Sequence, residues 1–379
     1  MKPADHPDLP FIGMEHVEAH TMKILGTVPA AQMKSAAVRF QPGDVLYGRL
    51  RPYLNKVVRP TFRGLCSAEF IVLPESERLA GKYLQYFLNS AEFVNFASHL
   101  NAGDRPRVDF DQIAEFEIPL QPLSAQHRIV AEIEKQFSRL DEAVANLQRV
   151  KANLKRYVSG VLADAVEGRL FPRASEWPAV AVEEVGDVLL GRQRAPQYLT
   201  GRWPRRYLRV ANIKDDRIAF DDLEEMDFDE KHFAKYRLAS GDILVSEGQS
   251  PELLGQSAIF RGFDEPLCFQ KTLHRFRARP RVTTAEFAQI VFRSHVRSGI
   301  FRKLGSITTN IGHLTLEKFK AAPFPLPPFE EQHRIVAEVD RRLSIVRGVE
   351  SEVDANLRHA QALRQAVLAR AFGASTHST

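Results

Sequence analysis

A cationic strand face is the feature of the first half whose residue types most clearly suit binding chemistry. The segment 45–51 follows a Gly-Asp turn and stops at Pro52, so it is predicted to be a strand. Arg49 and Arg51 then project from one face of that strand, because side chains alternate. Aromatic, amide and further cationic side chains follow closely: Tyr53, Asn55, Lys56 and Arg63. Such groups bind phosphates and base edges, so the cluster indicates DNA contact. An ordinary solvated strand face is the alternative interpretation.

Other basic residues extend this prediction to loops, a strand and a helix elsewhere in the chain. Arg105 and Arg107 lie in a polar loop of the first half. The candidates of the second half fall in a basic loop, around a strand and on a helix: Arg192, Arg194, Arg205, Arg206, Lys271, Arg275, Arg302 and Lys303. Net charge favours nucleic acid mainly in this half, where 24 Lys/Arg face 20 Asp/Glu over residues 171–323. We expect at least half of these side chains only to solvate strand edges and helix faces.

Two long helices are predicted to position these candidates. The heptapeptide Gln126–Glu132 recurs letter for letter at Gln332–Glu338, each time after a proline-rich segment. Apolar residues then alternate three and four apart, which is typical of a coiled-coil seam. The seam residues are Val130, Ile133, Phe137, Leu140 and Leu147 in the first copy, and Val336, Val339, Leu343, Val346 and Val353 in the second. We therefore expect helices over residues 124–167 and 330–372.

The globular parts that precede the two helices also repeat. Gly241-Asp242-Ile243-Leu244 matches Gly43-Asp44-Val45-Leu46, and the offset between matching segments grows slowly along the chain. Residues 79–97 are predicted to form one amphipathic helix of the first core. The chain is therefore a tandem repeat of a mixed α/β globular half and a long helix.

Catalytic and cofactor motifs are missing from the sequence. It contains no Gly-x-x-x-x-Gly-Lys-Ser/Thr loop and no Asn/Asp-Pro-Pro-Tyr/Phe run, which an amino-methyltransferase would be expected to carry. Cys66 and Cys268 fit no metal spacing, and His16 and His20 lack further ligands. His127 and His333, at the start of the two helices, suit a neutral packing or hydrogen-bonding role rather than acid–base work. We expect no enzyme activity, no cofactor and no metal.

The apolar runs of the sequence fall short of the ~20 residues that span a membrane. Residues 1–10 lack the layout of a secretory signal, and two unpaired cysteines suit a reducing compartment. A cytoplasmic protein is the expectation.

The sequence resembles the specificity (S) subunits of Type I restriction–modification systems. The resemblance covers nearly the whole chain and depends on the segment 43–56 and on both proline-to-helix segments, 118–132 and 325–336. It implies an α+β fold with two target recognition domains in tandem, each followed by a long helix, and the two helices forming an antiparallel coiled coil. The implied divisions are a first recognition domain at 1–117, a first spacer helix at 118–170, a second recognition domain at 171–323, and a second spacer helix and tail at 324–379.

The same resemblance implies partners. They are double-stranded DNA with a bipartite target, methyltransferase (M) subunits and restriction (R) subunits. The first half has no counterpart of residues 177–200, so we expect either an abbreviated first domain or a start that lies upstream.

The sequence thus predicts a non-catalytic subunit that reads bipartite DNA and directs M and R subunits to it. A coiled-coil scaffold whose two heads bind proteins remains the alternative.

Overall fold

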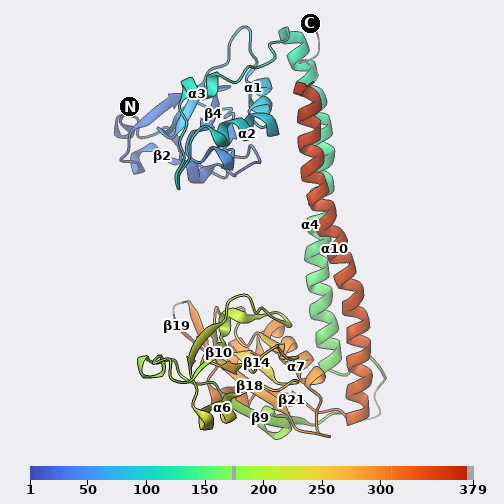
Figure 1. The fold of residues 1–379 in the computed structure, drawn as a ribbon. Helices are drawn as coiled ribbons and strands as arrows, with labels where there is room; N and C mark the ends of the chain where they lie inside the picture. The colour runs from blue at the N-terminus through green and yellow to red at the C-terminus, as the bar shows by residue number, and fades with distance from the viewer. Residues whose placement is uncertain (173–175, 309, 374–379) are drawn as a thin grey trace. The chain divides into compact units, whose positions relative to one another are not determined.

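Two compact units make up the protein, which is described by a computed structural model over residues 1–172, 176–308 and 310–373. Unit 1 contains Met1–Arg149 and the chain from Val353 on, and unit 2 contains Val150–Glu352. The long helices α4 (Leu123–Val166) and α10 (Phe329–Gly373) contribute residues to both units (Figure 1). None of the helices in the described ranges is long and apolar enough to cross a membrane.

The globular part of unit 1 combines small sheets with short helices. One sheet has the strand order β2-β1-β6-β3, with β1 parallel to β6, and another has the antiparallel order β5-β4-β7. The elements are β1 (Pro10–Ile12), β2 (Val28–Pro29), β3 (Ala37–Phe40), β4 (Val45–Gly48), β5 (Val57–Val58), β6 (Gly64–Ser67), β7 (Phe70–Leu73), α1 (Gly81–Phe87), α2 (Ala91–His99) and α3 (Phe110–Ala114).

Unit 2 is built around the antiparallel sheet β16-β14-β18-β9 and the mixed sheet β13-β10-β17, with smaller pairings β11-β12, β15-β20-β19 and β21-β8. Its strands are β8 (Ala179–Ala181), β9 (Gly186–Leu190), β10 (Pro204–Leu208), β11 (Ile213–Lys214), β12 (Arg217–Ile218), β13 (Glu224–Asp227), β14 (Ile243–Ser246), β15 (Gly248–Gln249), β16 (Ser257–Ile259), β17 (Cys268–Phe269), β18 (Leu273–Ala278), β19 (Ser306–Thr308), β20 (Ile311–His313) and β21 (Pro323–Pro325). Its shorter helices are α5 (Val182–Val185), α6 (Glu230–Tyr236), α7 (Ala285–Ser298), α8 (Ile300–Leu304) and α9 (Leu316–Lys320).

Two local predictions for the first half are wrong. The strand expected over 45–51 ends at Gly48, and Arg51 has a left-handed backbone (φ 53°) before a 3₁₀ turn, Pro52–Leu54. The Arg49 N–H still bonds to the Glu69 carbonyl beside β7, but from the Arg49 carbonyl on the backbone bonds to the loop before α3, which is why the strand stops early. The helix expected over 79–97 is two helices, α1 and α2, because Ser90 has an extended backbone and its Oγ caps α2 at the Phe93 N–H.

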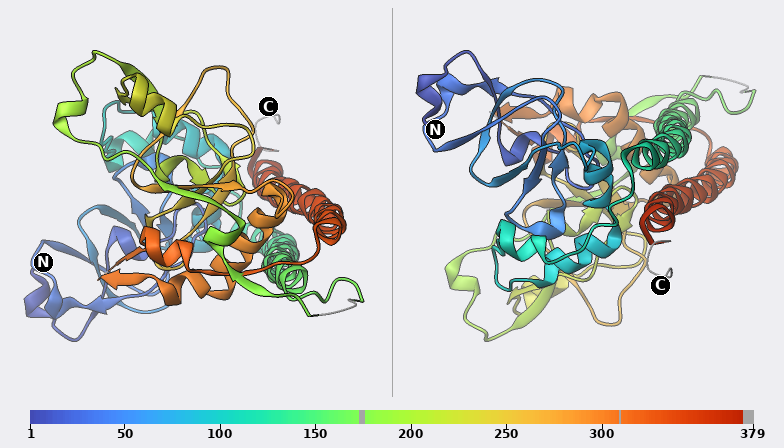
Figure 2. Two further views of the ribbon diagram at one scale, coloured as in Figure 1. Left: turned by 90° about the horizontal axis from the view of Figure 1, so that it is seen from below. Right: turned by 90° about the horizontal axis from the view of Figure 1, so that it is seen from above.

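The helices α4 and α10 run antiparallel within each unit. In unit 1, Val130 and Ile133 of α4 share a core with Leu368 and Phe372 of α10. In unit 2 the pairing joins the other ends of the same helices, since the core there combines the end of α4 with the start of α10. Both end-on views in Figure 2 show the two helices side by side. The predicted fold class, with an antiparallel pair of long helices, is confirmed.

Most of the predicted seam residues lie inside these cores. Val130, Ile133, Phe137, Val339, Leu343, Val346 and Val353 are buried, and Leu140, Leu147 and Val336 are half-buried. Three further residues, Leu162, Ile335 and Leu368, are at most 1% exposed although they lie outside the predicted seam. A heptad seam accounts only for contact between helices, whereas these helices also bury a face against the globular part of each unit.

A buried glutamine fixes the start of α4 against unit 1. The Gln126 side chain is 0% exposed, and its Oε1 accepts a hydrogen bond from the Ala80 N–H at 2.9 Å. Its Nε2 donates to the carbonyl oxygens of Arg78 (2.8 Å) and Gln121 (2.7 Å). The carboxamide therefore satisfies backbone groups on both sides of the junction between the helix and the globular part.

Gln332 does the same in unit 2. It is also 0% exposed, and its Oε1 accepts from the Thr284 N–H and the Thr283 hydroxyl, both at 3.1 Å. Its Nε2 donates to the carbonyl oxygens of Val282 (2.9 Å) and Pro327 (3.1 Å). The first letter of the repeated heptapeptide thus has one structural role, which is filled in both halves.

The repeated Gly-Asp motif is a turn that needs glycine. Gly43 and Gly241 have φ angles of +97° and +92°, a region that side chains rarely adopt. The aspartate that follows closes the turn: Asp44 Oδ2 accepts from the Gln41 N–H at 2.7 Å, and Asp242 Oδ2 from the Ala239 N–H at 2.8 Å. Both turns lead directly into a buried strand, β4 or β14.

We predict that Gln126→Ala and Gln332→Ala each destabilise their own unit by about 2–4 kcal/mol, because several buried backbone groups lose their partners. Gln148→Ala is the control, since Gln148 is exposed on α4 and should change stability by less than about 0.5 kcal/mol. Urea unfolding followed by circular dichroism measures the difference. Equal stabilities for all three variants would contradict a structural role for the carboxamides.

Two glycine substitutions in unit 2 should have opposite signs. Gly241→Ala places a side chain at φ +92° and should cost about 1–2 kcal/mol of unfolding free energy. Gly160 lies exposed within α4 with open space around its Cα, so Gly160→Ala should stabilise by about 0.5–1 kcal/mol. Thermal and urea unfolding of the two variants would test this, and a shift of the same sign in both would refute it.

Candidate DNA interface

The basic residues of unit 1 meet where the segment after β4 pairs with the loop before α3. The Arg49 carbonyl accepts from the Val108 N–H at 3.0 Å, and the Arg51 N–H donates to the Pro106 carbonyl at 2.7 Å. Leu50 forms an isolated bridge with Arg107. This pairing brings four of the predicted DNA contacts onto neighbouring backbone: Arg49, Arg51, Arg105 and Arg107.

Their side chains differ in how strongly the protein already holds them. Arg49 Nε donates to the Val108 carbonyl at 3.0 Å, and Arg107 forms a two-pronged ion pair with Glu69. Arg51 is half-buried, and its buried Nε has no hydrogen-bond partner among the described residues. Arg105 is exposed. Arg51 and Arg105 therefore remain available for phosphate or base contacts.

The residues that follow Arg51 do not form one surface. Tyr53 is 44% exposed, and Arg63 is exposed at the start of β6. Lys56 Nζ donates to the Met14 carbonyl at 2.6 Å. Asn55 is only 3% exposed and its Nδ2 donates to Asn89 Oδ1 at 2.8 Å, so its position does not agree with the surface contact expected from the sequence.

A cluster of positive charge in unit 2 extends from the end of β9 into β10. Residues 191–206 contain five arginines and no aspartate or glutamate. Arg192 is structural, because it is 6% exposed, its Nη1 donates to the Asp227 carbonyl at 2.7 Å, and its guanidinium lies 4.0 Å from the Tyr198 ring centre. Arg194 is exposed and lies 3.6 Å from a carboxylate oxygen of Glu224.

Strand β13 supplies the carboxylates that partly balance these arginines. It pairs with β10, and Arg206 of β10 contacts Glu225 at 3.5 Å and Glu265 at 3.2 Å. A hydrogen bond from Tyr207 lowers the pKa of Glu224. Burial opposes this shift and neighbouring arginines add to it, so Glu224 stays ionised. Exposed ion pairs of this kind contribute little free energy, so Arg194 and Arg206 can exchange a carboxylate for a phosphate at small cost.

The other candidates of unit 2 fall into four environments. Arg205 is exposed and stacks 4.8 Å from the Phe233 ring centre. Lys271 is exposed, and its N–H donates to the Arg192 carbonyl at 2.8 Å, which places it beside the basic segment. Arg275 of β18 is half-buried, and burial together with Arg277 lowers its pKa. Arg302 and Lys303 are exposed on α8, and Arg302 lines a separate cavity.

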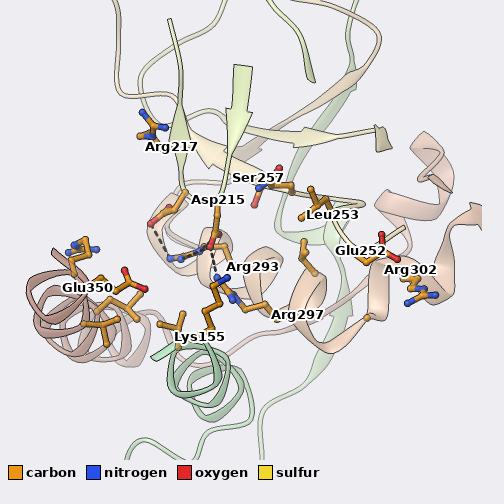
Figure 3. Close-up of a pocket in the computed structure, with 18 of the residues that line it drawn as sticks. Lys155, Asp215, Arg217, Glu252, Leu253, Ser257, Arg293, Arg297, Arg302 and Glu350 are labelled. Carbon is orange, nitrogen blue, oxygen red and sulfur yellow. Dashed lines mark hydrogen bonds and ion pairs between the residues drawn. The ribbon is translucent and has the colours of Figure 1, made fainter. Parts of the chain in front are cut away.

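That cavity lies within unit 2 and has a volume of about 840 Å³ (Figure 3). Arg293 lines the cavity and donates hydrogen bonds to Asp215 and Asp216, both at 3.0 Å. Arg297 also pairs with Asp215. Burial opposes the charge on Asp215, but the two arginines outweigh it and lower the pKa of the carboxyl. Asp215 and Asp216 are therefore already held in ion pairs. Among the described residues, no group of three or more His, Cys, Asp and Glu side chains could hold a metal ion.

Two surface residues of the basic segment were missed by the sequence reasoning. Leu199 and Trp203 are 46% and 45% exposed. A tryptophan inside an arginine-rich segment without acids is the signal that could have identified them.

Comparison with known proteins finds relatives of this sequence. Residues 175–348 match the family model for the type I restriction modification DNA specificity domain. The EcoDI specificity subunit of Escherichia coli is 29% identical, over 52% of this chain and 43% of its own length. The StySPI subunit of Salmonella potsdam is 25% identical (82% of this chain and 68% of its own), and the EcoKI subunit of E. coli K12 is 23% identical (80% and 67%). The chain thus spans less than half of the EcoDI subunit.

Solved structures agree on the fold. A chain from a study of complex assembly and conformational transition of the type I R-M system superposes with a TM-score of 0.78 at 21% identity, covering 98% of this chain and 93% of that one. The HsdS subunit of Thermoanaerobacter tengcongensis gives 0.53 at 21% identity, covering 98% and 92%. The relatives are named specificity subunits, in agreement with the predicted non-catalytic role. The resemblance predicted from the sequence is confirmed: residues 175–348 match the model of the type I restriction modification DNA specificity domain, and most of the chain is similar to type I specificity subunits.

Proposed function

We propose that the chain is a non-catalytic cytoplasmic subunit that reads a bipartite double-stranded DNA target and directs M and R subunits to it. Residues 1–117 and 171–323 would be the two target recognition domains, with 118–170 and 324–379 as spacer helices and tail. The observation that carries the proposal is the duplication: two quasi-equivalent units present different exposed arginines on the same glutamine and glycine anchors. Two moderate half-sites joined in one chain then bind with high effective concentration.

The repeated heptapeptide supports two copies of one partner. His127, Arg128 and Ala131 are exposed in the first copy, and the identical residues His333, Arg334 and Ala337 are exposed in the second. Arg334 and His333 also contact the rings of Phe171 and Phe329. Contact with the same partner at two places favours identical exposed residues more strongly than such packing does. Two M subunits, one at each helix start, fit this pattern.

Methylation mapping tests the whole proposal. The chain is expressed with its cognate M and R subunits, and methylated sites in the host genome are sequenced. We expect one split sequence with a fixed gap. A salt series on the purified chain then separates DNA binding from the protein-binding scaffold: affinity for the mapped duplex should fall steeply with salt, because phosphate contacts release counterions. Affinity that is absent, or indifferent to salt, would favour the scaffold.

We predict that Arg49→Ala combined with Arg51→Ala weakens recognition of one half-site only. A base-reading arginine should cost about 1–3 kcal/mol with relaxed preference at one position, while a phosphate contact weakens all sequences alike. Affinities are measured on duplexes in which either half-site is scrambled, with Arg139→Ala on the exposed face of α4 as the control. Equal loss at both half-sites would contradict separate reading by the two units.

The helix pair should set the gap between half-sites. Seven residues inserted after Arg149 in α4 and after Glu352 in α10, at the division between the units, keep the heptad register of both helices. The insertion adds about 10 Å of helix, which corresponds to roughly three base pairs of B-DNA.

Methylation is then expected at sites with unchanged half-sites and a gap about three base pairs longer. The control carries the insertion in α4 alone, which breaks the pairing with α10 and should abolish methylation. If the double insertion still modified only the original spacing, the helices would not determine the gap.

A further inference from the structure

The segment between β9 and β10 projects from the sheets of unit 2 (Figure 1). Its exposed end carries apolar side chains. Leu199 and Trp203 are 46% and 45% exposed, and the Arg202 guanidinium lies over the Trp203 ring, 4.3 Å from its centre. Single exposed apolar residues are ordinary on protein surfaces. Here, however, two of them flank an arginine in a segment without any acidic residue.

The backbone of this end is held rigidly by one buried carboxylate. Asp227 is 5% exposed, and its side chain accepts from the Thr200 N–H and hydroxyl, both at 2.7 Å, and from the Trp203 N–H at 2.8 Å. Hydrogen bonds from Thr200 and Trp203 lower the pKa of Asp227, so it stays charged. The Trp203 carbonyl accepts from the Phe228 N–H at 2.8 Å.

The turn is also anchored from the other side and shaped by glycine. Arg192 donates to the Asp227 carbonyl at 2.7 Å, and Gly201 has φ +75°. A loop fixed in this way presents its side chains in one arrangement, so little conformational entropy is lost when they bind.

The charges nearby determine what such a surface can approach. Arg194 and Arg206 contact carboxylates, but Arg202 and Arg205 stack on aromatic rings and have no carboxylate partner among the described residues. Stacking leaves the guanidinium charge uncompensated, so it attracts phosphates. Proteins that bend DNA combine arginine in the minor groove with apolar side chains pressed between base steps.

We infer that Trp203 and Leu199, with Arg202 stacked on the indole, form an apolar wedge that presses on a base step in the minor groove of one half-site. The inference depends on the proposed DNA-reading function and adds a shape-reading element to it. The wedge residues belong to unit 2, so the inference concerns the half-site that unit 2 reads.

The chain's own tryptophans provide a direct test. Trp203 and Trp177 are its two tryptophans, and Trp177 Nε1 donates to Glu331 in the core region of unit 2. In the Trp177→Phe variant, emission reports on Trp203 alone. Binding of the mapped duplex, followed independently by anisotropy of a labelled strand, should quench this emission through stacking. It should also reduce quenching by acrylamide several-fold.

Affinity measurements on variants give a second readout. Trp203→Ala should raise the Kd for the mapped duplex about tenfold to a hundredfold, with an unchanged slope of log Kd against log salt. Trp203→Phe should fall between this variant and the native chain. Arg202→Ala should reduce the salt slope by about 1. Leu253→Ala is the matched control, because Leu253 is 43% exposed in the same unit but lines the separate cavity.

The outcomes separate the wedge from the proposed function. If the duplex binds tightly while Trp203 emission and acrylamide access stay unchanged, and Trp203→Ala binds like the native chain, the wedge is wrong and DNA reading stands. If the native chain binds no duplex, the proposed function fails and the wedge with it. Melting curves establish that Trp203→Ala is folded. The single-tryptophan measurement decides the question even if it is not.

Discussion

A buried carboxamide at the start of each long helix is the interaction on which both units depend. Gln126 and Gln332 each donate and accept at once, and each connects a helix to the segment before α1 or α7. Glutamate has no N–H to donate, and leucine would leave backbone groups unsatisfied in the interior. This requirement explains why the residue is the same in both halves, where most of the globular sequence has diverged.

The anchors are constant while the surfaces they support vary. The same Gly-Asp turn leads into β4 and β14, yet a short 3₁₀ turn with Arg51 follows β4, and a different connection follows β14. The basic segment 191–206 runs into β10, which pairs with β13. The backbone pairing of these strands does not depend on which side chains face outward. Such a division allows the exposed residues to change without loss of the core, which suits a protein that must recognise a particular sequence.

The fold was largely predictable because its strongest signals are periodic or repeated. Heptad spacing indicated both long helices, and the doubled heptapeptide indicated the tandem arrangement. The candidate interface was less accessible, because exposure is decided by tertiary partners. Arg192 looks like any other arginine of its segment, yet Asp227 and Tyr198 bury it. Asn55 is buried and donates a hydrogen bond to Asn89. Arg51 lies outside the strand because its N–H bonds to the Pro106 carbonyl in the loop.

The division of each long helix between the units has a consequence for how the chain folds during synthesis. Unit 2 is one continuous stretch, Val150–Glu352, whereas the core of unit 1 includes Leu368 and Phe372 packed with Tyr83 and Phe87. Contacts so distant in sequence form slowly, and here they cannot form until the last turns of α10 leave the ribosome. Unit 1 is therefore translated first and completed last. Tyr83 and Phe87 lack their partner Phe372 until unit 2 has been synthesised.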